Sequence, residues 1–300
     1  MRQTVAVARF NFRGFFKNPK VILTLLLSVI LCYLLSARVM EVIEAYGTPV
    51  QLAEPFLWTF GDAYSVLLSS ILLILLFSDL PMVSGITPYY LYRTTRGKWL
   101  AGQMLYVAGV VLLYTGFLFG VTVLLCGKYS YLGDKWSETA AMLAYSKLGE
   151  ELGVPSTVKV MESITPYGCM LQVLGLLFLY ALVLSFLILA GNLRSGKNRG
   201  MAGGLLFSLY GLLLNRDVIA ALFGWEKYEG YRANLLIGWL SPLSHATYGK
   251  HSFGYDRLPS LSASRLVFTG LLFLFAGISL RAGKRYSFAF LGESSYTHGR

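Results

Sequence analysis

Residues 169–193, CMLQVLGLLFLYALVLSFLILAGNL, contain no charged side chain over 25 consecutive positions. A helix needs roughly 20 mostly apolar residues to cross the hydrocarbon core of a bilayer. Lipid offers no hydrogen-bond partners to the backbone, so a spanning segment must pair its own N–H and C=O groups as a helix. The stretch therefore predicts a membrane-spanning helix in an all-α membrane protein.

The composition of the remaining chain supports the same fold class. Hydrophobic residues make up 55% of the 300 positions and charged residues 14%, whereas soluble globular domains carry about 25% charged residues. Six apolar runs predict six transmembrane helices, at about 21–37, 63–78, 100–126, 169–193, 201–223 and 266–280. The fifth run is the weakest, because Asn215, Arg216 and Asp217 interrupt it. We interpret residues 1–300 as a single transmembrane domain.

The basic residues gather on one side of the predicted membrane. The N-terminal segment, the loops after the second and fourth spans and the C-terminal tail together hold 15 Lys and Arg but 2 Asp and Glu. The opposite side holds the remaining 11 basic and 13 acidic residues. The positive-inside rule then predicts cytoplasmic N and C termini, and external loops at 127–168 and 224–264, in a multi-pass protein of the plasma membrane. Topology thus accounts for the net charge of +11, which does not indicate a nucleic-acid partner.

Residues 2–19 predict an amphipathic elbow helix that lies in the membrane interface. At 100° per residue, apolar side chains fill one arc of this helix and basic side chains the adjacent arc. The apolar arc comprises Val5, Ala8, Phe12, Phe15 and Phe16, and the basic arc comprises Arg2, Arg9, Arg13 and Lys17. Such a helix turns its phenylalanines toward the acyl chains and its basic side chains toward anionic lipid headgroups. We single out Arg9, Phe12, Arg13 and Phe16 as interface residues.

The segment after the second span combines prolines, tyrosines and basic residues. Pro81 and Pro88 prevent one continuous helix. The residues of interest are Tyr89, Tyr90, Tyr92, Arg93, Arg96 and Lys98. One interpretation is that they hold topology only, as an aromatic belt and a positive-inside cluster. The other is that a short, stiff cytoplasmic connection between two spans is a place where a partner protein can push.

The two external loops also carry structural signals. Apolar residues at a spacing of three to four predict a helix within 137–152, ended by Gly153 and Pro155. Residues 235–248, which include Ser241-Pro242, are too short to cross the membrane and too apolar for a solvated loop. They predict a re-entrant or interfacial hairpin before the last span.

Catalytic and cofactor motifs are not recognisable in the sequence. Residues 191–198, GNLRSGKN, nearly match the phosphate-binding loop G-x-x-x-x-G-K-[ST]. However, Asn198 replaces the Ser or Thr that would bind Mg²⁺, and the motif follows a long apolar helix instead of a strand. Glu150, Glu151 and the three histidines lack metal-ligand spacing. We therefore expect no enzyme activity, metal or cofactor in this chain.

Cysteines and glycines at the spans have simple structural interpretations. Cys126 and Cys169 would either form a disulfide, if their spans are neighbours, or serve as small apolar residues at helix ends, which we favour. Gly109, Gly116 and Gly120 in the third span predict a face of close helix–helix contact.

Taken together, the basic elbow, the six spans, the segment 88–99 and the apolar segment 235–248 resemble the type-2 class of ATP-binding-cassette (ABC) exporter permeases. The resemblance covers nearly the whole chain but rests on architecture, since this class has no catalytic signature. The loop 127–168 is longer than the connection common in the class, which leaves the subfamily open.

The resemblance implies a transport subunit that exports a lipid-like, peptide or drug-like substrate. A separate cytoplasmic ABC ATPase subunit would bind ATP and Mg²⁺ and would contact the elbow and residues 89–98. A second permease subunit, identical or similar, would complete the pathway. The alternative is a membrane sensor, assembly factor or immunity protein that transports nothing and couples to no ATPase. A lipid-modifying membrane enzyme is a third interpretation, for which the sequence offers no nucleophile or metal cluster.

Overall fold

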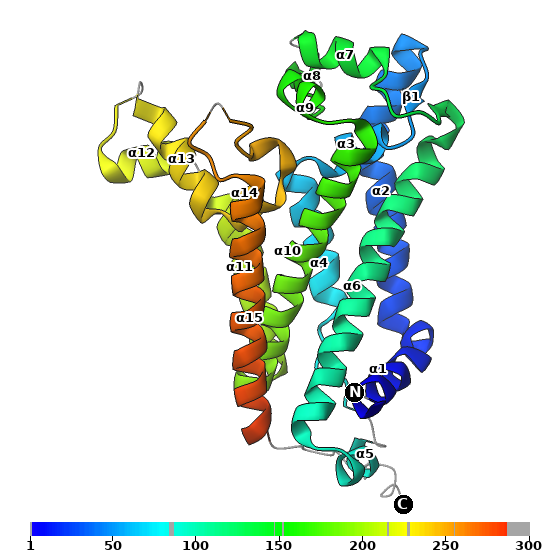
Figure 1. Cartoon of the computed structure of the whole chain (residues 1–300), viewed down its shortest axis with the longest axis vertical. Coiled ribbons are helices and arrows are strands. Elements are labelled where there is room, and N and C mark those ends of the chain that lie inside the picture. The colour runs from blue at the N-terminus through cyan, green and yellow to red at the C-terminus, as the bar shows by residue number, and fades with distance from the viewer. Residues whose placement is uncertain are drawn as a thin grey trace, which may run out of the picture.

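The computed structural model describes residues 2–83, 87–146, 148–151, 153–214, 216–226, 229–254 and 256–286. Long helices run side by side along its longest axis, and shorter helices cover one end of this bundle (Figure 1). The long helices are α2 (Pro19–Tyr46), α4 (Ala63–Leu76), α6 (Arg96–Cys126), α10 (Pro166–Ser195), α11 (Lys197–Leu213) and α15 (Leu261–Arg285). The predicted helical class is confirmed, because strand among the described residues is limited to two segments of two residues each.

Four helices, α2, α6, α10 and α15, are each long and apolar enough to cross a membrane. Two bent pairs of helices pass the same test together. In the first pair, α3 (Glu54–Phe60) meets α4 at 80°, and in the second, α11 meets α12 (Arg216–Phe223) at 77°. The described residues thus hold four to six helices that could span a membrane.

The helices differ in extent from two of the predicted spans. The run 201–223 is not one helix, because α11 ends at Leu213 and α12 takes a new direction. Arg216 and Asp217 follow this bend, and charged side chains disfavour a helix that continues through lipid. The first span is longer than 21–37, since α2 continues to Tyr46, where Gly47 adopts a left-handed conformation (φ 65°) that ends the helix.

α10 is the central helix of the bundle. It packs against α4, α6, α11 and α15, and protein buries 72% of its most apolar window. The same measure is 28% for α2 and 17% for α15, which therefore keep most of their apolar surface turned outward. The uncharged stretch 169–193 is thus the core of the protein, and the helices around it leave apolar side chains on the outside of the bundle.

The predicted cytoplasmic segments gather at one end of the bundle. Figure 1 shows α1 (Arg2–Arg13), α5 (Thr87–Arg93) and the C-terminal end of α15 together at the lower end. The turn between α10 and α11 lies at the same end. We call this the basic end. Residues 287–300 of the predicted cytoplasmic tail lie outside the described residues.

The opposite end carries a helical cap. β1 (Val50–Gln51) pairs in parallel with β2 (Ser130–Tyr131), which ties the chain after α2 to the chain after α6. The cap contains α7 (Glu138–Tyr145), α8 (Leu148–Glu151) and α9 (Val158–Ser163). The helix predicted within 137–152 is therefore divided, since α7 ends at Tyr145 and residues 147 and 152 lie outside the described part.

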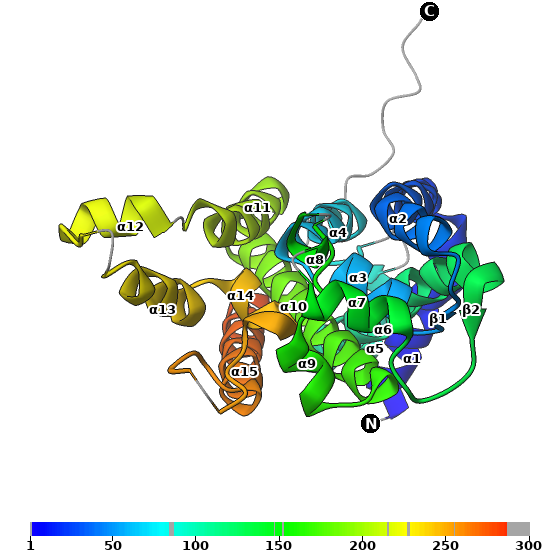
Figure 2. The same ribbon diagram turned by 90° about the horizontal axis from the view of Figure 1, so that it is seen from above.

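The segment 216–250 extends sideways and then returns to the bundle. Figures 1 and 2 show α12 and α13 (Gly230–Leu240) projecting from the upper end of α11 and α15. The chain then forms α14 (Pro242–Ala246) and a short 3-10 helix, η4 (Tyr248–Lys250). Every residue of α14 is buried, in contact with α4, α10, α11 and α13. The predicted hairpin at 235–248 thus consists of an outer helix, α13, and a buried turn, α14.

Candidate functional site

α1 packs along the start of α6, where two glycines allow a close approach. A Cβ atom on Gly102 would lie 2.7 Å from the Val7 Cβ, and one on Gly109 would lie 2.7 Å from the Phe12 ring. Tyr106, between these glycines, meets the Phe12 ring edge-on with the ring centroids 5.0 Å apart. This side of α1 is therefore docked on protein.

The predicted lipid-facing arc of the elbow helix is wrong. Phe12 packs on α6 and Phe15 is buried, whereas Phe16 is 68% exposed. The reason is that α1 ends at Arg13 and a 3-10 helix, η1 (Phe15–Lys17), follows, so the 100° spacing does not continue to the last two phenylalanines. Arg9 and Arg13 both lie exposed.

The glycine face predicted on the third span is also wrong for two of its three members. Gly109 meets Phe12, but a Cβ atom on Gly116 or Gly120 would have no atom of the described chain within 4 Å. The contacts instead follow Gly102 and Gly109, one heptad apart, because α1 covers only the first part of α6.

The loop that precedes α5 is held at the basic end by polar contacts to three long helices. The contacts are Lys20 Nζ to Asp79 Oδ2 (2.6 Å), Asn192 Nδ2 to the Leu80 carbonyl oxygen (2.7 Å), and Gln103 to the Met82 backbone N–H and carbonyl (3.2 and 3.1 Å). Lys20 belongs to α2, Gln103 to α6 and Asn192 to α10. Gln103 is fully buried and Asn192 is 2% exposed. A backbone held through buried hydrogen bonds is costly to displace.

The near-match to a phosphate-binding loop is a tight turn between two helices. A Cβ atom on Gly191 would lie 2.7 Å from the Gly200 Cα, so α10 and α11 cross with their backbones in contact. Gly196 has φ 100°, a conformation that L side chains rarely adopt. Asn192 Oδ1 accepts the Gly200 backbone N–H at 3.0 Å. Packing between helices therefore accounts for the glycines that suggested a nucleotide.

The end of α5 and the start of α6 (Arg96–Cys126) are attached to neighbouring elements of the basic end. Gln3 of α1 donates from Nε2 to the Arg93 carbonyl oxygen (3.3 Å), and its Oε1 accepts from Lys98 Nζ (3.0 Å). Arg96 donates from Nη1 to the carbonyl oxygen of Lys284 in α15 (2.8 Å). Tyr92 is 95% exposed. The side chains of Tyr89 and Tyr90 lie outside the described part of the structure.

A basic cavity of about 610 Å³ lies beside this attachment, between the C-terminal ends of α10 and α15. Its lining consists of Arg194, Arg281, Lys284 and Arg285, together with Leu193, Ile278 and Ala282. Four cations around one concave surface create a positive potential that favours acidic groups of a partner or of lipid.

At the opposite end, Glu54 connects α3 to the cap. Its carboxylate is fully buried and accepts three hydrogen bonds. The donors are the Ser137 N–H (2.7 Å), the Ser137 hydroxyl (2.6 Å) and the Gln51 N–H (3.0 Å). Every one of these partners donates to it, so the carboxyl group is held in place by three hydrogen bonds. Glu54 is thus a structural contact between the cap and the helix bundle.

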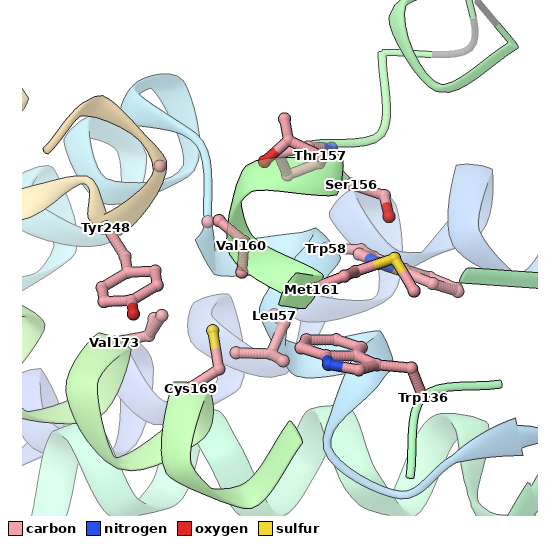
Figure 3. A pocket seen from close by; sticks show the side chains of 13 residues that line it. Leu57, Trp58, Trp136, Ser156, Thr157, Val160, Met161, Cys169, Val173 and Tyr248 are labelled. Atoms are coloured by element: carbon pink, nitrogen blue, oxygen red, sulfur yellow. The ribbon is translucent and has the colours of Figure 1, made fainter. Parts of the chain in front are cut away.

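An apolar cavity lies next to this contact (Figure 3). Trp58, Trp136 and Met161 turn toward the same space, and Cys169 and Val173 of α10 form its base. Its volume of about 30 Å³ has room for about two water molecules. The cavity is too small for a transported molecule.

The cysteines form no disulfide, and no metal-ligand cluster of His, Cys, Asp or Glu occurs within the described residues. Cys32, Cys126 and Cys169 are buried and unpaired, so no disulfide joins the third and fourth spans. The same part of the chain contains no group of three His, Cys, Asp or Glu that could hold a metal ion.

Sequence reasoning missed the residues that position the basic end. Gln103 and Asn192 are the polar side chains that interrupt two apolar runs, and a polar group in such a run is a signal of a specific partner. The sequence gave less reason to single out Glu54, since an acidic residue before a proline is typical of the start of a helix and does not indicate a distant partner.

No protein-family model matches this chain, and neither a curated protein nor a solved structure does.

Proposed function

We propose that the chain is the membrane-spanning subunit of an ATP-driven exporter, built like the type-2 class of ABC permeases. A separate cytoplasmic ATPase would act on the basic end through α5. The observation that carries this proposal is the attachment of α5. Its one described tyrosine side chain, Tyr92, is 95% exposed, while the chain on both sides of α5 is hydrogen-bonded to the long helices.

This attachment favours α5 as a contact that transmits force. A partner that displaced α5 would act on α1 through the contact of Gln3 with Arg93, and it would act on α15 through Arg96 at the start of α6. Residues 79–82, which precede α5 in the chain, would bring the same displacement to α2, α6 and α10 through their hydrogen bonds. A stiff connection passes on such a displacement, whereas a mobile loop would absorb it.

The energy source is assigned to a partner because the only nucleotide-like motif of the chain is accounted for by helix packing. A Cβ atom on Gly191 would lie 2.7 Å from the Gly200 Cα, and the side chain of Asn192 in α10 accepts the Gly200 backbone N–H in the first turn of α11. ATP and Mg²⁺ would therefore bind to the ATPase subunit. The pathway would run between two permease subunits, and apolar outer surfaces suit a lipid-like, peptide or drug-like substrate exported across the plasma membrane.

The direct test is assembly with an ABC ATPase after extraction in detergent. Tyr92→Ala and Tyr90→Ala should weaken assembly by about 1–3 kcal/mol, the range of an interface anchor, and reduce the ATP hydrolysis of the complex. Tyr64→Ala is the matched control, since Tyr64 is 61% exposed but belongs to the start of α4, away from α5. If no ATPase accompanies the protein, the non-transporting alternative replaces this proposal.

A further inference from the structure

Two buried histidines share one serine hydroxyl near the end of the bundle that carries the cap. Ser264 Oγ of α15 lies 2.7 Å from His245 Nδ1 of α14 and 2.8 Å from His251 Nε2, which follows η4. The exposed fractions are 2% for His245, 1% for His251 and 0% for Ser264. The cluster joins α14 and η4 to the first turn of α15.

The second nitrogen of each imidazole faces a carbonyl oxygen. His245 Nε2 lies 3.0 Å from the Trp239 oxygen, and His251 Nδ1 lies 3.0 Å from the Tyr248 oxygen. A carbonyl oxygen only accepts hydrogen bonds, so each of these nitrogens must carry a hydrogen. In a neutral imidazole, the nitrogen that faces Ser264 is then an acceptor.

The hydrogens of the neutral cluster do not suffice for its contacts. Four short contacts need four hydrogens, while two neutral imidazoles and one hydroxyl supply three. Ser264 can donate to one imidazole only, so the other nitrogen and the hydroxyl oxygen face each other with lone pairs. Buried polar atoms left in this state cost free energy.

We infer that the His245–Ser264–His251 cluster is a binding site for one proton. With His251 cationic, His251 Nε2 donates to Ser264 Oγ, and the hydroxyl donates to His245 Nδ1. Transfer of the hydroxyl hydrogen to His245 Nδ1, together with transfer of the His251 Nε2 hydrogen to Ser264 Oγ, reverses the chain and moves the charge to His245. A second proton would leave the hydroxyl hydrogen without an acceptor among these contacts and would place two cations on either side of one oxygen atom.

The surroundings set the pH at which the site fills. Burial lowers the pKa of His245 below its ordinary value of 6.5. Burial also lowers the pKa of His251, and the nearby charge of Arg265 lowers it further. The other titratable neighbours are Tyr248 of η4, Cys169 of α10 near Tyr248, and Tyr180 of α10, which shares the Phe268 ring with His245. Burial thus opposes the charge that the missing hydrogen favours, and the site fills on acidification.

The test is an NMR titration of the full chain labelled with ¹⁵N-histidine in lipid nanodiscs, from pH 8 to pH 5. The chain has three histidines, so the signals are few, and His298→Gln assigns the third. The signals of His245 and His251 should move with one common midpoint and together account for one proton. Two separate midpoints, with a full proton on each ring, would overturn the proposal.

Removal of one histidine should shift the pKa of the other in the direction opposite to the one that charge repulsion alone would give. In His251→Phe, the Ser264 hydroxyl can always donate to His245, so no extra proton is needed and the pKa of His245 should fall. If the two rings titrate independently, loss of a neighbouring cation should raise the pKa of His245. A rise would therefore contradict the one-proton site.

Serine variants separate the chemistry from a change in fold. Ser264→Ala removes the acceptor for the extra N–H, so the pKa of both histidines should fall, and Ser264→Thr should restore the shared midpoint. Ser279→Ala is the matched control, because Ser279 is a buried serine of the same helix whose hydroxyl has no hydrogen-bond partner in the described part of the chain. It should leave the titration unchanged. An unchanged titration in Ser264→Ala would contradict the proposal.

Discussion

The side-chain amide of Asn192 donates a hydrogen bond of 2.7 Å to the backbone carbonyl oxygen of Leu80, which precedes it by 112 positions. The same side chain accepts the Gly200 backbone N–H at 3.0 Å. One buried residue thus joins the turn between α10 and α11 to the loop before α5. The contact thus connects the central helix of the bundle to the chain that leads toward α5.

Replacement of Asn192 should therefore destabilise the basic end. Asn192→Ala leaves the Leu80 carbonyl and the Gly200 N–H without their partner, at a cost of about 1–3 kcal/mol. Asn198→Ala is the control, because Asn198 follows the same turn but is exposed. Thermal unfolding of the purified variants in detergent checks this. Equal midpoints for the two variants would show that the bridge contributes no stability.

The glycines of the α10–α11 turn should tolerate substitution according to the space around them. A methyl group on Gly200 would overlap the Asn192 side chain and the Ile188 carbonyl, so Gly200→Ala should cost about 1–3 kcal/mol or more. Gly203, one turn further along α11, has open space, and Gly203→Ala should be neutral or stabilising by up to about 1 kcal/mol. The expression yield and the midpoint of thermal unfolding of each variant test this. A Gly200→Ala protein as stable as the unchanged protein would contradict the close crossing of α10 and α11.

Glu54 should be essential for the attachment of the cap. Glu54→Gln turns an amide N–H₂ toward groups that are all donors, so we expect a loss of at least about 2 kcal/mol. Glu138→Gln is the control, since Glu138 begins α7 next to Ser137 but is exposed. Limited proteolysis should cut residues 127–165 faster in Glu54→Gln than in Glu138→Gln. Equal rates would show that the carboxylate does not hold the cap.

The orientation in the membrane follows from the distribution of charge and can be measured directly. In a chain without its three native cysteines, Ser195→Cys should react with an impermeant maleimide only after the cells are permeabilised. Leu132→Cys should react from outside, because Leu132 is 81% exposed and lies at the opposite end. Labelling of Ser195→Cys in intact cells would refute the cytoplasmic position of the basic end.

The apolar runs predicted the helices well because span length and hydrophobicity depend on the bilayer alone. The uncharged run at 169–193 marked α10, the central helix, and the basic clusters marked the segments that lie at one end. The bend at α3–α4 was missed, and the bend at α11–α12 was signalled only by the polar residues 215–217 that interrupt the fifth run. These bends depend on how neighbouring helices cover the exposed backbone, which no local pattern records.

The placement of the candidate site residues was less predictable for a physical reason. The wheel for 2–19 assumed one continuous helix, and the end of α1 at Arg13 separated Phe16 from Phe12. Likewise, glycine spacing indicates where a helix permits contact but not which element occupies the space, so Gly109 meets α1 while Gly116 meets nothing within the described chain. The contacts of Asn192 and Glu54 join residues 80 or more positions apart and need the folded structure.

The most direct test of the proposed function is site-specific photo-cross-linking from α5 in living cells. In one variant of the chain, a photoreactive phenylalanine analogue replaces Tyr92. In the control variant, the same analogue replaces Leu132 at the opposite end of the bundle. We expect position 92 to give a cross-linked product that contains an ATPase subunit, recognised by its labelling with a photoreactive ATP analogue. Position 132 should give no such product. A product without an ATP-binding protein at position 92, or the same product from both positions, would contradict it.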